Sequence, residues 1–203
     1  MEELNQEKFQ KLNSTILNIF KKKNNINNLD LKKKLILEIG IGMGENLIYM
    51  SKKNTQTNII GVDPFMNGMV NVSDYSINNN IKNIYLYPFV FQKFLNKFKK
   101  LRFNEIYVLF PDPWPKKRHQ KRRLFDENFL RLISKKGNKN SKIFFKTDSY
   151  NYYEQVYNII IKFKKRELIR DFYHNLNTKI KTKYHQKAIK NESKIYSLII
   201  ENN

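Results

Sequence analysis

The chain reads Leu35-Ile-Leu-Glu-Ile-Gly-Ile-Gly-Met-Gly44 where an apolar run meets three glycines. Residues 35–39 predict a buried strand. Glycines directly after a strand let the backbone turn sharply and approach a ligand closely. A nucleotide-binding turn and an ordinary tight strand–helix turn both fit, because a glycine pattern alone is a weak signal.

Acidic residues around these glycines favour a nucleotide that carries positive charge. Asp63 ends the next apolar run, about 20 residues after Gly44, which is the spacing at which an acid binds a ribose hydroxyl. A pyrophosphate-binding turn would have its last glycine where this chain has Glu45, and a carboxylate there would repel pyrophosphate. Glu38 lies directly before the turn. We therefore predict S-adenosylmethionine, which carries a sulfonium and an ammonium, in preference to NAD.

The rest of the chain alternates between strand and helix patterns. Strands are expected at 35–39, 58–62, 84–87, 105–110, 142–147, 167–173 and 195–201. Helices are expected after the glycine loop to about residue 53, and at 65–79, 92–100, 126–134 and 150–163. This alternation predicts an α/β fold with a mostly parallel sheet and helices on both faces. The late strands lack a clear helix between them, which favours an antiparallel edge strand.

Composition predicts one folded domain with a polyanionic partner. The 203 residues are 40% hydrophobic, contain no Cys and carry a net charge of +21. The charge favours a nucleic acid, although AT-rich codons also enrich Lys, Asn and Ile. Residues 1–34 are expected to form an N-terminal extension and residues 35–203 the domain. The chain has no apolar run long enough for a membrane span and no signal pattern at its start, so we expect a cytoplasmic protein with no membrane contact.

A second motif joins a rigid acid to a cationic run. Asp112 lies between Pro111 and Pro113, directly after an expected strand and next to Trp114. Open α/β sheets bind ligands where strands end, and the prolines stiffen the backbone there. The basic residues that follow are expected to grip RNA phosphates: Lys116, Lys117, Arg118, Lys121, Arg122 and Arg123. The alternative is a proline turn followed by a solvated basic helix.

Five segments together resemble the bacterial tRNA (guanine-N7)-methyltransferase family. They are Leu37-Glu-Ile-Gly-Ile-Gly-Met-Gly44, Gly61-Val-Asp63, Phe110-Pro-Asp-Pro-Trp-Pro-Lys-Lys-Arg-His119, Lys121-Arg-Arg123 and Thr147-Asp148. The resemblance implies a Rossmann-like class I methyltransferase fold with a seven-stranded sheet. It also implies transfer of a methyl group from S-adenosylmethionine to N7 of a guanine in the variable loop of tRNA.

The resemblance also implies roles for single residues. Cofactor contacts would come from Glu38, Gly40, Gly42, Gly44, Asp63 and Asp112. Asp112 would double as the catalytic-site residue, with Lys116 and Asp148 contacting the substrate. The family's late Thr-x-Phe-Glu motif falls on Thr182-Lys183-Tyr184-His185, so two of its positions differ here. Near the adenine, Val90 stands where the family has an acidic or amide residue.

Methylation of guanine N7 does not require the protein to remove a proton. N7 has an in-plane lone pair and no proton, so no general base is needed. Asp112 and Asp148 can accept from the guanine edge and offset its developing charge. Asp148 fits the N-cap of the next helix equally well, and Trp114 fits either base stacking or core burial. No metal is expected, because the three histidines lack ligand spacing.

Two other functions fit the same sequence. One is methylation of an exocyclic base amine, whose enzymes carry Asp/Asn-Pro-Pro-aromatic; here Asp112-Pro-Trp lacks the second proline. The other is a non-catalytic RNA-binding domain with a degenerate cofactor pocket, which Val90 and the altered late motif leave open. The sequence fits a monomer or a homodimer.

Overall fold

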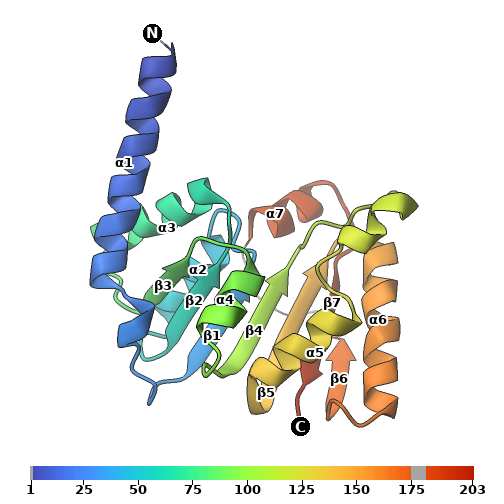
Figure 1. Ribbon diagram of the computed structural model, residues 1–203. Coiled ribbons are helices and arrows are strands. Elements are labelled where there is room, and N and C mark those ends of the chain that lie inside the picture. Colours follow the sequence, from blue (N-terminus) through green and yellow to red (C-terminus); the bar gives the residue numbers. More distant parts are fainter. Residues whose placement is uncertain (1, 175–181) are drawn as a thin grey trace.

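The protein forms one seven-stranded sheet with the strand order β3-β2-β1-β4-β5-β7-β6 (Figure 1). The computed structural model describes residues 2–174 and 182–203. β7 pairs antiparallel with both neighbours, and the other pairings are parallel. The predicted fold class is therefore confirmed, with the reversed strand one position in from the edge.

The elements follow the chain in alternation. The strands are β1 Leu35–Ile39, β2 Asn58–Val62, β3 Ile84–Tyr87, β4 Phe103–Leu109, β5 Gly137–Thr147, β6 Asp171–His174 and β7 Tyr196–Glu201. The α-helices are α1 Glu2–Lys23, α2 Glu45–Lys53, α3 Met66–Asn78, α4 Phe91–Lys97, α5 Glu127–Lys136, α6 Tyr150–Lys165 and α7 Lys183–Lys190. Two 3₁₀ helices, η1 Ile26–Asn28 and η2 Lys117–Arg122, lie in the loops.

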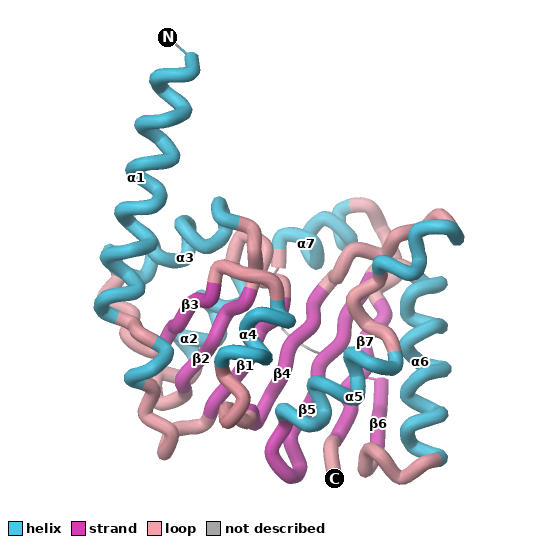
Figure 2. The backbone as a smooth tube through the Cα atoms, in the orientation of Figure 1, coloured by secondary structure: helices cyan, strands magenta, loops and turns pink. Residues whose placement is uncertain are grey.

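Helices cover both faces of the sheet, as Figure 2 shows. One core joins the sheet to apolar residues of α4, α5 and α6, and the other joins it to α1, α2 and α3. Alternate residues of β1 serve opposite faces, so that Leu37 lies in the first core and Ile36 in the second. Leu17 and Phe20 of α1 are buried in the second core, which ties part of the N-terminal segment to the domain. The proposed boundary at residue 34 stays a prediction.

Helix α7 lies where no helix was expected. Thr182 caps it, because its hydroxyl accepts from the backbone N–H of His185 at 3.0 Å. Ala188 is the one buried apolar residue among the described side chains of the helix, and these side chains form no apolar stripe that a sequence pattern would reveal.

The strand order creates a crevice at one edge of the sheet. The chain builds β1, β2 and β3 outward, then returns to place β4 on the other side of β1. Open α/β sheets bind ligands at such a switch point, beyond the carboxyl ends of the strands. No helix among the described residues is long and apolar enough to cross a membrane.

Candidate active site

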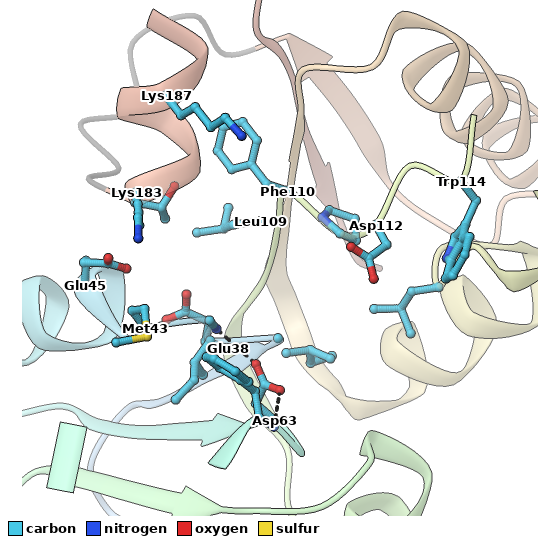
Figure 3. Close-up of a pocket in the computed structure, with 18 of the residues that line it drawn as sticks. Glu38, Met43, Glu45, Asp63, Leu109, Phe110, Asp112, Trp114, Lys183 and Lys187 are labelled. Atoms are coloured by element: carbon cyan, nitrogen blue, oxygen red, sulfur yellow. Dashed lines mark hydrogen bonds between the residues drawn. The ribbon is translucent and has the colours of Figure 1, made fainter. Parts of the chain in front are cut away.

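A cavity of about 680 Å³ opens beyond the carboxyl ends of β1, β2 and β4 (Figure 3). The glycine loop, the Pro-Asp-Pro loop and the start of α7 supply its walls. Glu38 and Asp63 lie on one side, while Asp112 and Trp114 lie on another. Sequence motifs separated by about 70 residues therefore meet at one cavity, as their positions after strands predicted.

The glycine loop adopts a backbone that favours glycine. Gly40, Gly42 and Gly44 have φ angles of 78°, 55° and 85°. Asp63 holds this loop: one carboxylate oxygen accepts from the Gly42 N–H at 3.0 Å and the other from the Phe65 N–H at 2.8 Å. Each oxygen keeps a second acceptor site, so the carboxylate can brace the loop and also receive a ribose hydroxyl.

Gly68 of α3 packs against the glycine loop, and the sequence analysis did not identify it. A Cβ on Gly68 would lie 1.7 Å from the carbonyl oxygen of Gly42, so only glycine lets α3 approach the loop this closely. Nothing in the local pattern Met66-Asn-Gly-Met-Val70 separates this glycine from an ordinary helical one. The signal lies in a contact between distant parts of the chain.

Glu38 is a buried acid beneath the loop. Its side chain is 1% exposed, and its Oε2 has no hydrogen-bond partner among the described residues. Burial, which is the largest cause, and the nearby charges of Glu45 and Asp63 raise the pKa of Glu38 to about 8, against a lowering by the hydrogen bond from Asn46. A cation at this position would pair with the carboxylate and stabilise its ionised form.

These features fit S-adenosylmethionine. The acids Glu38, Glu45 and Asp63 offer partners for its cationic groups. A Cβ on Gly40 would meet nothing within 4 Å, so open space lies over the loop where a ligand would rest. Val90, by contrast, is 49% exposed and is not among the residues that line the cavity.

The Pro-Asp-Pro loop is held in an unusual conformation. Phe110 and Trp114, on either side of it, have φ angles of 49° and 41°, which non-glycine residues seldom adopt. The Phe110 N–H donates to the Lys146 carbonyl at 2.7 Å and anchors the loop to β5. Asp112 is exposed and lines the cavity. Strain of this kind persists where surrounding contacts fix it, and it is concentrated at functional sites.

Trp114 lies at the cavity and is only partly buried, so core burial is the wrong alternative. Its ring centre is 5.9 Å from that of His119, with the planes perpendicular. The Arg122 guanidinium lies 5.1 Å from the ring centre. A cation and an aromatic ring beside one another suit contact with a nucleotide.

The basic run divides into exposed residues and one buried residue, Arg123. Lys116, Lys117, Arg118, Lys121 and Arg122 are exposed and remain available to phosphates. Lys116 lies outside the residues that line the cavity.

Arg123 is a correction. It is 5% exposed, and its guanidinium donates to the Pro113 carbonyl, Gln155 Oε1 and Asn151 Oδ1 at 2.8, 2.6 and 2.8 Å. These internal bonds leave no role for Arg123 at an RNA phosphate; instead it fastens the Pro-Asp-Pro loop to α6.

Asp148 does not cap α6. Ser149 is the N-cap, and its hydroxyl accepts from the Tyr152 N–H at 3.4 Å. Asp148 is exposed and lies outside the residues that line the cavity. Its substrate contact stays a prediction.

Helix α7 brings only part of the late motif to the cavity. Thr182 and Lys183 line it, together with Lys187, which the sequence analysis missed because it missed the helix. His185 is not among the residues that line the cavity; its Nδ1 lies 3.4 Å from Lys146 Nζ, and its ring meets Phe110 edge to face. Burial lowers the pKa of both partners, to about 8 for Lys146. The side chain of Tyr184 lies outside the described residues.

The chain is similar to known methyltransferases over most of its length. A model of the methyltransferase family Methyltransf_4 matches residues 32–198. The tRNA (guanine-N(7)-)-methyltransferase of Wolbachia pipientis wMel is 32% identical over 81% of this chain and 73% of that protein. The bifunctional methyltransferase of Rickettsia prowazekii (strain Madrid E) is 39% identical over 78% of this chain. This chain matches only 31% of the length of that longer relative.

Solved structures share the fold. The 16S rRNA methyltransferase KamB has a TM-score of 0.60 at 10% identity, covering 91% of this chain and 90% of that one. An antibiotic-related methyltransferase has a TM-score of 0.56 at 16% identity, covering 84% and 87%. The fold is thus shared with solved methyltransferase structures.

Proposed function

This chain belongs to the tRNA (guanine-N7-)-methyltransferase family, and we propose that it methylates N7 of a guanine in the variable loop of tRNA. S-adenosylmethionine is the donor, and the cytoplasm is the compartment in which we place the reaction. One observation carries the proposal: the buried Glu38 beneath the glycine loop and Asp112 of the strained proline loop face a single cavity. A site for a cationic donor therefore adjoins an acid that can hold a purine edge.

When bound, S-adenosylmethionine supplies an electrophilic methyl group on a positively charged sulfur. Glu38 and Asp63, which line the cavity on either side of the glycine loop in sequence, would hold it. Asp112 would accept from the guanine ring N–H and amino group, aligning N7 without removing a proton. As positive charge develops on the purine, the same carboxylate offsets it.

Substrate RNA would be held mainly through its phosphates. Arg122, the last residue of η2, lines the cavity beside Trp114. The other exposed cations of η2 therefore lie close to the cavity. Such contacts fix register on the RNA and carry little sequence information. Lys116 and Asp148, together with residues 182–185, complete the proposed substrate contacts.

A methyl-transfer assay on unmodified tRNA tests this proposal, with nucleosides identified by mass spectrometry. A matched transcript carries 7-deazaguanosine at the variable-loop position, where N7 is replaced by C–H. We expect 7-methylguanosine from the first transcript and no transfer at that position of the second. A methyl group on an exocyclic amine would contradict the N7 assignment. Failure to bind S-adenosylmethionine in calorimetry would point to a non-catalytic RNA-binding domain.

Salt dependence should separate the exposed cations from Arg123. Changing Lys117 and Lys121 together to Ala should reduce the slope of log Kd against log salt by about one unit per lysine, because fewer counterions are released. Arg123→Ala should leave that slope unchanged and lower the Tm, because its guanidinium is bonded internally. The control changes Lys32 and Lys33 together to Ala. These lysines precede β1, at the amino ends of the parallel strands and away from the cavity. An unchanged slope for Lys117 and Lys121 would make η2 a solvated face.

A further inference from the structure

A ladder of aromatic rings lies between α6 and the antiparallel strands β6 and β7. Tyr150, Tyr153 and Tyr157 follow the i, i+3, i+7 spacing that places residues on one side of a helix. Tyr153 stacks on Tyr157 with ring centres 5.9 Å apart, and Tyr157 stacks on His174 of β6 at 5.9 Å. Tyr196 of β7 joins from the sheet, 5.0 Å from Tyr153 and 5.5 Å from Tyr150. We call these five residues the aromatic ladder.

The ladder begins at the same edge of the sheet as the cavity. Tyr196 pairs with Thr147, the last residue of β5, and Tyr150 starts the helix that follows. Figure 2 shows α6 running from this edge alongside β6 and β7. Asp148, the proposed guanine contact, lies two residues before Tyr150. Tyr150, the first ring of the ladder, is therefore close in sequence to a proposed substrate contact.

Tyr150 is the open end of the ladder. It is 56% exposed, whereas Tyr153, Tyr157 and Tyr196 are half-buried. Tyr153 and Tyr157 pack against the core, which explains them without any ligand. Packing against the core does not explain Tyr150, whose ring is left mostly in solvent and is tilted by 34° and 58° to those of Tyr153 and Tyr196. Such a ring offers a face on which another aromatic group can stack.

The basic 3₁₀ helix η2 and its C-cap Arg123 are hydrogen-bonded to the residue next to this open end. Asn151, the neighbour of Tyr150, accepts from Gln120 Nε2 at 3.1 Å and from the Arg123 guanidinium at 2.8 Å. These bonds hold the Lys/Arg run of η2 against the start of α6. Glu154 is the acid that contacts Tyr150, and it binds the hydroxyl at 3.4 Å rather than a ring face. An aromatic face beside exposed cations suits a single-stranded nucleic acid, whose bases stack while its phosphates pair with Lys and Arg.

We propose that Tyr150, backed by the aromatic ladder, stacks a nucleobase of the RNA substrate outside the methyl-transfer cavity. The identity of that RNA as tRNA rests on the proposed function. The exposed cations of η2 bind the phosphates of the same segment, so that base stacking and phosphate contacts together set how the strand enters the cavity. Stacking of this kind tolerates any base, because every base has an aromatic face.

Binding of tRNA to Tyr150→Ala across a range of salt concentrations tests the proposal. We expect the Kd to rise about tenfold at every salt concentration, because base stacking on an aromatic side chain contributes on this scale. The plot of log Kd against log salt should shift without changing slope, since no phosphate contact is lost. Tyr150→Phe keeps the ring and should bind like the wild type. The affinity for S-adenosylmethionine should not change in either variant.

Tyr173→Ala is the matched control. Tyr173 is also exposed, at 39%, but its ring lies 5.8 Å from Lys142 Nζ, whereas its neighbour Phe172 contacts Tyr157 of the ladder. Successive strand residues point to opposite faces, so Tyr173 lies on the face away from the ladder. Its loss should leave RNA binding unchanged.

The outcomes separate this inference from the proposed function. Wild-type affinity in Tyr150→Ala, or an equal loss in Tyr150→Phe and Tyr173→Ala, would overturn the stacking site whatever reaction the protein performs. A wild-type protein that forms no 7-methylguanosine, yet binds RNA through Tyr150, would overturn the proposed reaction and leave the stacking site standing. Circular dichroism melting confirms that each variant is folded.

Discussion

Asp112→Asn should lower kcat by about two orders of magnitude, which is the scale of losing one preorganised electrostatic contact in a transition state. The substitution keeps the size of the side chain but removes its charge and turns one acceptor oxygen into a donor. Asparagine therefore accepts fewer bonds from the guanine edge and cannot offset the charge that develops there. The exposed cations of η2 are untouched, so the Kd for tRNA should change far less than kcat.

We expect Asp112→Asn to leave the stability of the fold nearly unchanged. The loop is fixed by its prolines, by the Phe110–Lys146 backbone bond and by the Arg123 guanidinium on Pro113. None of these contacts uses the Asp112 carboxylate. Turnover at saturating tRNA and S-adenosylmethionine is the measurement, with the Tm recorded beside it. Asp74→Asn, an exposed acid on α3, is the control. A folded Asp112→Asn variant with near-normal turnover would refute the assignment.

Strands β1, β2 and β3 were predictable because nearly all their side chains are buried. β1, β2 and β3 have the predicted bounds, since each is a short apolar run ended by a glycine, proline or polar residue. Helix α7 was not predictable, because its described side chains offer a capping threonine and one buried alanine in place of an apolar stripe. The turn at residues 167–170 was read as part of a strand because its apolar residues, Leu168 and Ile169, resemble one.

The site was predictable where a motif follows a strand. Glu38, Asp63 and Asp112 reach one cavity because parallel strands end at the same edge. Contacts between distant segments were not predictable. Arg123 cannot be told from Arg122 in a run of cations, yet one is buried against α6 and the other lies over Trp114.

Glu38 should make the ligand-free protein less stable as the pH rises from about 5 to 8. The pKa of its carboxyl is about 8 in the folded protein, against 4.5 as the ordinary value. Between these values the unfolded chain releases a proton that the folded protein keeps, so the unfolded state binds fewer protons and rising pH favours it. Each pH unit costs 1.36 kcal/mol, which gives a loss on the order of 4 kcal/mol by pH 7.5. The loss should level off above pH 8, where both states are ionised.

Glu38→Gln isolates this effect, because a neutral amide of the same shape does not titrate. The free energy of unfolding, measured by urea denaturation at several pH values, should be similar for the two proteins near pH 4.5. It should then diverge in favour of Glu38→Gln up to pH 8. The exposed Glu154→Gln should follow the wild type.

Saturating S-adenosylmethionine supplies the second arm of this test. A cation beside Glu38 favours the ionised carboxylate, so the wild-type dependence on pH should flatten when the ligand is bound. Glu38→Gln should bind the ligand more weakly, because its amide cannot pair with a cation. Parallel stability curves for wild type and Glu38→Gln would mean that Glu38 is already ionised in the free protein. Equal ligand affinity would remove it from the cofactor site. The two readouts fail independently, since the first depends on the burial of Glu38 and on its charged neighbours, and the second on whether the carboxylate binds the ligand.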